Sequence, residues 1–332
     1  MKIRRVNYFD KFKLKKSISF LSPDVVAHYT KVFRNYPFLH FHKFLPLSMK
    51  FLPESYIMEE DNSKNILGMI TAIPTSGNQN KIAISRLFLE MNYYEVGKQL
   101  IDYVIAKYGA IGATSFISII DERNDELLQL FSEGCGFRQF ASEQLWQVEN
   151  IKETNVPEFV RPFKNSDAKD VAELFNDSLI THYKPSLLRK KEEYTENIFK
   201  GLADRRIFRY VVASSFNKNK MKAYFAISTT DGVNFVVVIT LSAWEETSIE
   251  TILKFAKREI SKVSKNFVMY IKIRKYTTSA ETIEQALLNN GGSCTQTQIV
   301  LVKDFYKPVK DFETEHSIIL FNDFKERSVY KS

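Results

Sequence analysis

The sequence predicts an α+β protein (an α/β mixed sheet) in which one fold occurs twice, each copy being a mixed, mostly antiparallel sheet flanked by helices. The same order of strands, turns and helices occurs twice along the chain. Equivalent positions keep their spacing: Lys81 to Asn234 and Val96 to Ile249 are both 153 residues apart (234 − 81 and 249 − 96). Unrelated domains rarely share order, turn positions and spacing, so we interpret the chain as a duplication. Copies of about 150 residues have an ordinary domain size.

The first copy opens with helical sequence and continues as a three-stranded meander. Ser22 followed by Pro23 is typical of a helix N-terminus. The segments SYIMEED, ILGMITAI and KIAISRLFLEM are predicted strands, separated by turns rich in Asn, Gly and Ser. A helix follows, with Val96, Leu100 and Val104 along one side. The strand TSFISII, the helix NDELLQLFSEGCGF and the closing strand QFASEQLWQVE complete the copy.

The second copy repeats this order. Ser166 is the predicted N-cap of the helix SDAKDVAELFNDSL. The meander is FRYVVASSF, MKAYFAIS and FVVVITLSAW, and the elements after it are IETILKFAKREI, NFVMYIKI, SAETIEQALLNNGG and TQTQIVLVKDF. These patterns predict a first domain at 1–150, a polar linker at 151–159, a second domain at 160–305 and a tail at 306–332. The tail segment HSIILF is either an added strand on an exposed sheet edge or part of a disordered end.

Composition limits the class of protein. A hydrophobic fraction of 44% and an aromatic fraction of 14% indicate a folded chain. No apolar run reaches the twenty or so residues that span a bilayer, and no secretory signal is visible, which predicts a cytoplasmic protein without a membrane partner. Two cysteines and five scattered histidines predict no disulfide framework and no metal site. The net charge of +8 includes basic runs that suit a solvated face or an anionic ligand.

One short segment, NYYEVGKQL, joins the fourth strand to the following helix. Together with the order of elements it resembles the GNAT (general-control-related N-acetyltransferase) superfamily, present twice over nearly the whole chain. The family loop has the form Arg/Gln-x-x-Gly-x-Gly/Ala, and Asn92, Glu95 and Gly97 occupy its defined positions, of which only Gly97 matches. A later family motif places Asn124 and Phe131 ahead of a Gly-Phe pair. The resemblance implies two tandem GNAT-like (acyl-CoA N-acyltransferase) domains.

Backbone N–H groups at a helix N-terminus favour an anion such as a pyrophosphate. The resemblance therefore implies that acetyl-CoA or another acyl-CoA binds beside the fourth strand and its helix. The alternative for NYYEVGKQL is a plain strand-to-helix turn, and the alternative for Asn124 is an N-cap. The implied cofactor-binding residues are Leu87, Phe88, Leu89, Tyr94, Glu95, Val96, Gly97, Lys98, Gln99, Asn124 and Phe131.

Acyl transfer needs a polarised thioester carbonyl, a neutral amine and a proton for the leaving thiolate. The resemblance places the polarising backbone N–H at 87–89. The family's tyrosine acid is replaced by Phe131, so Tyr93, Tyr94 or water would have to substitute. Candidate bases are Glu90, Asp121 and Glu122, with ordinary surface carboxylates as the alternative. The aromatic segment 33–53 is predicted to pack in the core, to form an apolar acceptor pocket or to join the copies.

In the second copy the aligned stretch WEETSIET has no glycine and three glutamates, Glu245, Glu246 and Glu250. Their charge would repel a pyrophosphate, so we expect this copy not to bind CoA. Three hypotheses follow: an N-acyltransferase acting through the first copy on a small-molecule or peptide amine, a catalytically silent relative that binds CoA weakly or acts as a scaffold, and a nucleic-acid binder. The third ranks last because only KFKLKK interleaves basic and aromatic residues. The oligomeric state is left open.

Overall fold

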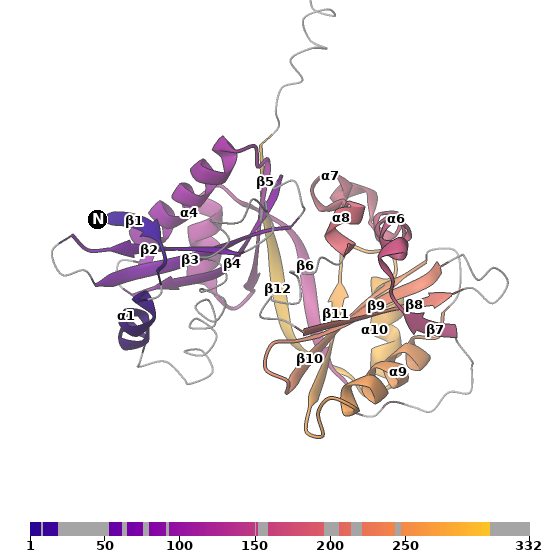
Figure 1. The fold of residues 1–332 in the computed structure, drawn as a ribbon. Coiled ribbons are helices and arrows are strands. Elements are labelled where there is room, and N and C mark those ends of the chain that lie inside the picture. The colour runs from indigo at the N-terminus through magenta and orange to yellow at the C-terminus, as the bar shows by residue number, and fades with distance from the viewer. Residues whose placement is uncertain are drawn as a thin grey trace, which may run out of the picture.

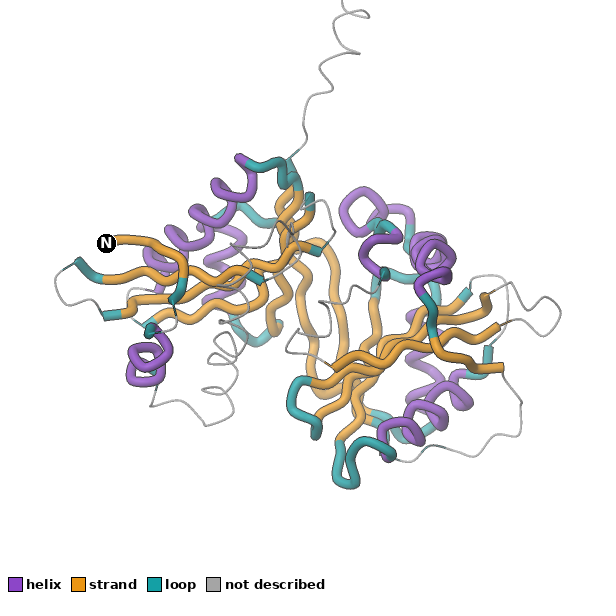
Figure 2. Tube along the Cα trace, in the orientation of Figure 1, coloured by secondary structure: helices purple, strands orange, loops and turns teal. Residues whose placement is uncertain are grey.

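The structure, a computed structural model, describes residues 1–7, 9–18, 53–61, 65–75, 80–90, 93–149, 151, 159–195, 206–213, 221–242 and 247–305. They form one mixed sheet of twelve strands with helices on both faces (Figures 1 and 2). The predicted α+β class is therefore confirmed. The predicted helix at Ser22, the aromatic segment up to residue 52 and the tail 306–332 lie outside the described residues.

The N-terminal half contains every strand predicted for it among the described residues. Its elements are β1 (Lys2–Arg5), α1 (Asp10–Ser17), β2 (Glu54–Glu59), β3 (Ile66–Pro74), β4 (Lys81–Leu89), α4 (Tyr93–Ala110), β5 (Ser115–Asp121), α5 (Asp125–Gln129), η3 (Leu130–Gly134) and β6 (Arg138–Gln147). The helix predicted over 124–137 is shorter than expected. It consists of one α-helical turn followed by the π-helical turn η3, which ends before Cys135.

The C-terminal half repeats the order. Its elements are β7 (Phe159–Pro162), η4 (Asn165–Asp167), α6 (Ala168–Ser178), η5 (Thr181–Tyr183), α7 (Lys184–Leu187), α8 (Lys191–Tyr194), β8 (Arg206–Ala213), β9 (Met221–Thr229), β10 (Asn234–Leu241), α9 (Ile249–Ser261), β11 (Val268–Arg274), α10 (Ala280–Asn289) and β12 (Ser293–Asp304). The prediction that Ser166 caps α6 is wrong. Ser166 lies inside the 3-10 turn η4, and the N-cap position belongs to Asp167.

A paired arginine and aspartate join the first strand to the first helix in both halves. Arg4 on β1 forms two hydrogen bonds with the Asp10 carboxylate, at 2.8 and 2.7 Å. Arg161 on β7 holds Asp167 in the same way, at 2.8 and 2.9 Å. Each aspartate also accepts a backbone N–H from the residue three positions earlier. The two halves therefore share a detail of side-chain chemistry as well as the order of their elements.

The two halves exchange their last strands. The sheet order is β1-β2-β3-β4-β5-β12-β6-β11-β10-β9-β8-β7, so β12 lies beside β5 and β6 lies beside β11. Gln298 of β12 is in register with Asp121 of β5 on one side and with Glu143 of β6 on the other. The expectation that QFASEQLWQVE closes the sheet of its own copy is therefore wrong. The terminal strands β6 and β12 have equivalent hydrophobic patterns, so that either one can form hydrogen bonds with the free edge of β5 or of β11.

In each half of the molecule, helices cover both faces of the sheet (Figure 1). In the N-terminal half, α4 packs against Tyr56 and Phe116 and α1 packs against Ile57 and Met69. In the C-terminal half, α9 and α10 cover one face and α6 to α8 the other. The α6–α8 layer also contacts residues of β12, including Val302, so that the exchanged strand is buried under helices of its own half.

Candidate functional site

The parallel strands β4 and β5 separate at their carboxyl ends. Lys81–Ile84 of β4 are in register with Ser115–Ser118 of β5, and the pairing ends there although both strands continue. A cavity of about 200 Å³ occupies the opening, and we call it the β4–β5 cavity. Its lining comes from residues 84–87 of β4, residues 118–121 of β5 and the α5–η3 segment.

A β-bulge shapes the β4 side of this cavity. Thr71 on β3 pairs with Arg86, whereas Ala72 pairs with Ile84, so that Ser85 is an extra residue on β4. A bulge leaves backbone groups outside the ladder and turns the strand locally, and bulges often lie next to active sites. The equivalent strand β10 pairs with β9 from Phe235 to Leu241 without any shift in register. The two halves therefore differ at the position where their folds would otherwise be equivalent.

Gly97 lies where α4 packs most closely on its neighbours. A Cβ atom at this position would be 2.5 Å from the Cδ2 atom of Leu130 and 3.0 Å from the Cδ1 atom of Leu89. Val96 is fully buried in the same core. The absence of a side chain at Gly97 therefore allows helix α4 to approach β4 and η3, which is a packing role.

The side chains of the first turns of α4 interact along the helix surface. Gln99 donates to the Glu95 carboxylate at 3.3 Å, and Lys98 forms an ion pair with Asp102 at 2.7 Å. The hydroxyl group of Tyr94 lies over Gly134 of η3. Glu95 is exposed and directed away from the core, so its charge supports the helix rather than filling the strand-to-helix turn.

The three leucine and phenylalanine positions at the end of β4 have different environments. Leu87 lines the β4–β5 cavity. Phe88 is buried on the face of the sheet that α1 covers, opposite to the face that α4 covers. Leu89 packs against α4 at Gly97. The structure therefore brings only Leu87 of this group to the cavity.

Of the candidate bases, only Asp121 lines the cavity. Arg123 pairs with its carboxylate at 2.7 Å and also donates its backbone N–H, and Gln296 from β12 donates at 2.7 Å. The hydrogen bonds from Arg123 hold the pKa of Asp121 well below its usual range, which makes this carboxylate a weak base. Glu90 and Glu122 are exposed at the ends of their strands.

Asn124 and Phe131 both line the cavity, each with a second role. The Asn124 side chain accepts a hydrogen bond from the backbone N–H of Leu127 at 3.1 Å and so caps α5. The Phe131 ring is 1% exposed and packs edge-to-face on Phe137, with the ring centres 5.1 Å apart. The ring therefore lies at the cavity wall without offering a proton.

Sequence reasoning did not identify Ser85, Arg86, Ser118 or Ile119 as cavity residues. One signal was available: Arg86 is a lone charged residue in the apolar strand segment AISRLFL. The others carry no such signal, because the cavity depends on the bulge and on where the strand pairing ends. The Ser118 hydroxyl marks that end, since it donates to the backbone carbonyl of Ile84 at 3.4 Å.

Among the described residues no cluster of histidine, cysteine or carboxylate side chains could hold a metal ion. No helix in the same part of the chain is long and apolar enough to cross a membrane.

The mixed sheet, the separated fourth and fifth strands and the repeated order of elements define the fold of the GNAT proteins, present here in tandem. No protein-family model and no curated protein matches the sequence. Among solved structures, a tandem GNAT protein from the clavulanic acid biosynthesis pathway is similar, with 9% identity, a TM-score of 0.59, and coverage of 92% of this chain and 99% of that one. A GCN5-related N-acetyltransferase from Sphaerobacter thermophilus is similar with 10% identity and a TM-score of 0.57, covering 93% of this chain and 96% of its own.

Proposed function

We propose that the N-terminal half binds an acyl-CoA, such as acetyl-CoA, in the β4–β5 cavity and transfers the acyl group to a small-molecule or peptide amine. The observation that carries the proposal is the cavity between two separating parallel strands, beside a bulge that β10 lacks over Phe235–Leu241. The GNAT fold of similar structures supports the same class of reaction.

In this proposal the backbone around Ser85 and Arg86 faces the thioester carbonyl. A bulge turns backbone N–H groups out of the ladder, and such groups stabilise the negative charge that develops on a carbonyl oxygen. The Arg86 side chain, which also lines the cavity, adds a positive charge nearby. The N-terminus of α4 follows β4 directly and contributes the positive end of a helix dipole to the phosphate side.

Positioning, rather than side-chain acid–base chemistry, supplies most of the catalysis that we propose. Phe131 cannot protonate the leaving thiolate, and Asp121 is committed to Arg123 and Gln296. Water then carries the proton to the thiolate and from the amine. Holding the two reactants together still lowers the barrier substantially, because a bimolecular step becomes effectively unimolecular.

The C-terminal half has a structural or shaping role in this proposal. The Ser248 hydroxyl caps α9 by accepting the backbone N–H of Thr251 at 3.2 Å, and the Glu250 carboxylate accepts from Ser248 at 3.3 Å. One N–H group at this helix end is therefore already bonded, and a carboxylate lies beside it. Both features disfavour a pyrophosphate there.

The second candidate is a catalytically silent GNAT-fold protein that binds CoA weakly or acts as a scaffold. The burial of Phe131, where the family has its tyrosine acid, favours this candidate. It predicts weak CoA binding or none, and no turnover, whereas the enzyme hypothesis predicts both binding and turnover.

Thermal unfolding with and without acetyl-CoA tests the proposal. A ligand at a hundred times its Kd stabilises the folded state by about 2.7 kcal/mol, which raises Tm by a few degrees in a protein of this size. Ile119→Trp should remove the shift, because Ile119 lines the cavity and is 45% exposed, so that the larger ring can enter the opening. The matched control is Leu288→Trp on α10, a residue 50% exposed and outside the cavity lining.

No shift at millimolar acetyl-CoA, or an equal shift in Ile119→Trp, would overturn the proposed binding site. Release of the free CoA thiol in the presence of amines then separates the two candidates. A shift without thiol release across a panel of small amines and peptides would leave the silent protein as the correct description.

A further inference from the structure

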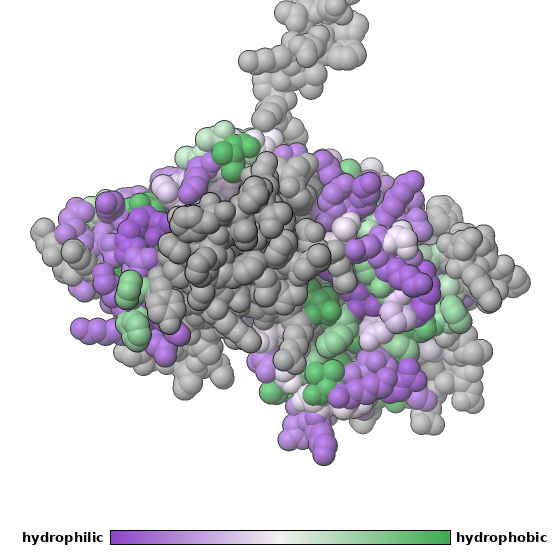
Figure 3. All heavy atoms as spheres, viewed as in Figure 1, coloured by the Kyte–Doolittle hydropathy of each residue, from purple (hydrophilic) through white to green (hydrophobic). Residues whose placement is uncertain are grey.

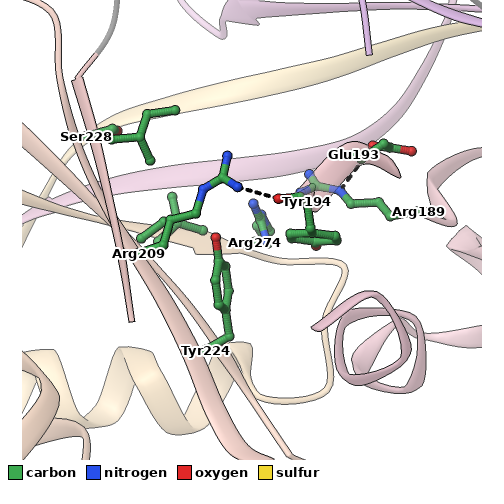
Figure 4. Close-up of a pocket in the computed structure, with 10 residues that line it drawn as sticks. Arg189, Glu193, Tyr194, Arg209, Tyr224, Ser228 and Arg274 are labelled. Atoms are coloured by element: carbon green, nitrogen blue, oxygen red, sulfur yellow. Dashed lines mark hydrogen bonds and ion pairs between the residues drawn. The ribbon is translucent and has the colours of Figure 1, made fainter. Parts of the chain in front are cut away.

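A second cavity, of about 160 Å³, lies in the C-terminal half on the face that α6 to α8 cover. Strands β8 to β11 form its floor, and the segment from Arg189 to Tyr194 forms its rim. Three arginine side chains converge on it, Arg189 from the rim and Arg209 and Arg274 from the floor (Figure 4). We call this cavity the arginine pocket.

The pocket is hollow because of the residues on β9. Tyr224, Ala226 and Ser228 alternate along the strand and therefore face the same side of the sheet. Ala226 and Ser228 are small, which leaves space above the strand. The hydroxyl group of Tyr224 points toward the arginine side chains in Figure 4.

Neighbouring groups hold all three guanidinium groups in place. Arg189 and Arg274 lie near the ring of Phe175, at 4.4 and 5.1 Å from its centre. Arg209 donates to the backbone carbonyl of Tyr194. Fixed guanidinium groups lose little conformational freedom when they bind an anion, because their geometry is already set.

Two carboxylates among the described residues lie near these arginines. Glu193 lines the pocket and lies 4.0 Å from Arg189. Glu143 lies 3.9 Å from Arg274 but pairs more closely with Lys272, at 2.6 Å.

The Arg274 side chain is almost fully enclosed by its neighbours. Its side chain is 11% exposed, and its Nε atom is buried without a hydrogen-bond partner among the described residues. In the view of Figure 3, hydrophilic residues lie beside hydrophobic ones over the C-terminal half.

We propose that the arginine pocket binds the carboxylate or phosphate group of a small molecule. Guanidinium groups match both groups, because their N–H donors form pairs of parallel hydrogen bonds with two oxygen atoms. The site is separate from the β4–β5 cavity and does not depend on acyl-CoA binding. It gives the C-terminal half a ligand of its own, of a chemical class distinct from a thioester.

Isothermal titration calorimetry on the full chain, with inorganic phosphate, acetate and succinate as probes at constant ionic strength, tests the proposal. Binding of phosphate alone would identify a phosphate ligand, and binding of the carboxylates alone would identify a carboxylate ligand. Arg209→Gln should weaken binding at least about tenfold, because it removes one charged donor. Arg258→Gln is the matched control, since Arg258 is an exposed arginine of the same half that lies outside the pocket lining.

Ala226→Leu separates anion binding from an effect on folding. The larger side chain fills the pocket without changing any charge, and its unfolding midpoint reports whether the protein remains intact. We expect binding to disappear in Ala226→Leu and to persist in Arg258→Gln. If none of the three probes binds, or if both pocket variants bind them as tightly as the original protein, the arginines serve only to hold the α7–α8 segment on the sheet and the proposal is wrong.

Discussion

Glu143 lies on β6 where the exchanged strands meet, and the variant Glu143→Gln tests what holds that junction. The side chain is 4% exposed. Its carboxylate accepts a hydrogen bond from Lys272 at 2.6 Å and one from the Tyr276 hydroxyl at 2.6 Å, and Arg274 lies at 3.9 Å. Glutamine keeps the size and shape of the side chain but removes the negative charge, so that two cations lose their shared partner.

The expected loss of stability can be worked out in two ways. Burial by itself would raise the pKa of Glu143, but the charges of Lys272 and Arg274 and two hydrogen bonds outweigh burial and lower the pKa from 4.5 to about 2. A lowering of this size corresponds to about 3 kcal/mol of stability at neutral pH. Breaking a buried ion pair by removing one partner costs about 3–5 kcal/mol. The two estimates agree.

The pH dependence has a definite sign. Because the pKa is lower in the folded state, the contribution of Glu143 is fully present above about pH 4.5 and is lost as the pH falls toward 2. The difference in free energy of unfolding between the original protein and Glu143→Gln should therefore be about 3 kcal/mol at pH 7 and should shrink through this range.

Urea unfolding followed by circular dichroism measures the difference. Glu133→Gln is the control, because Glu133 is an exposed residue of the same half that accepts a hydrogen bond from Gln129 on the helix surface. A second variant, Glu143→Gln combined with Lys272→Met, should recover part of the loss, since it also removes one unpaired cation. A cost below about 1 kcal/mol at pH 7, or a difference that does not change with pH, would refute the assignment of Glu143 as the shared partner of these cations.

Three further predictions concern the N-terminal half. Gly97→Ala should destabilise the protein by about 1–3 kcal/mol in urea unfolding, because the new methyl group would be 2.5 Å from a leucine carbon. In the control Gly109→Ala, in the same helix, the methyl group meets nothing within 4 Å and should stabilise the protein by about 0.5–1 kcal/mol. Equal effects of the two variants would contradict the packing role of Gly97. Phe131→Tyr should increase the release of CoA thiol by up to about 100-fold by restoring an acid at the cavity, and Phe137→Tyr, which lies outside the cavity lining, should not. Residues 1–150 alone should form a dimer in light scattering, because the structure places β6 away from β5 of its own half, so that β6 of a second copy would take the place of β12 beside β5. A folded monomer would count against the strand exchange.

Local pattern determined the elements and their repetition. The strands alternate or run continuously apolar, and the helices carry one apolar side, so the meander, the helix at Val96 and its equivalent at Ile249 could be read directly. The spacing of 153 residues recurs in the structure, where Ser115 begins β5 and Val268 begins β11 (268 − 115). The wrong prediction of Ser166 as the N-cap also has a local cause, because the Asp167 carboxylate accepts a hydrogen bond from Arg161 on the preceding strand β7.

The candidate site was predicted only in part. Leu87, Asn124 and Phe131 line the cavity, and Asp121 lies there with its charge already paired, whereas their binding of a cofactor stays a prediction. The pairing could not be foreseen, because one of its donors, Gln296, comes from a strand more than a hundred residues later. The bulge at Ser85 also has no signature in a single sequence, since it depends on how two strands match in register.

What the sequence alone determined is therefore the set of elements and the twofold order, because both depend on hydrophobic spacing within short segments. What only the tertiary structure decided is which last strand pairs with which half, where β4 and β5 separate, and how arginines from β8, β11 and the rim beside α8 converge on one pocket. Those outcomes depend on pairings between residues far apart in the chain. The terminal strands β6 and β12 have similar patterns, so nothing within either one selects its partner.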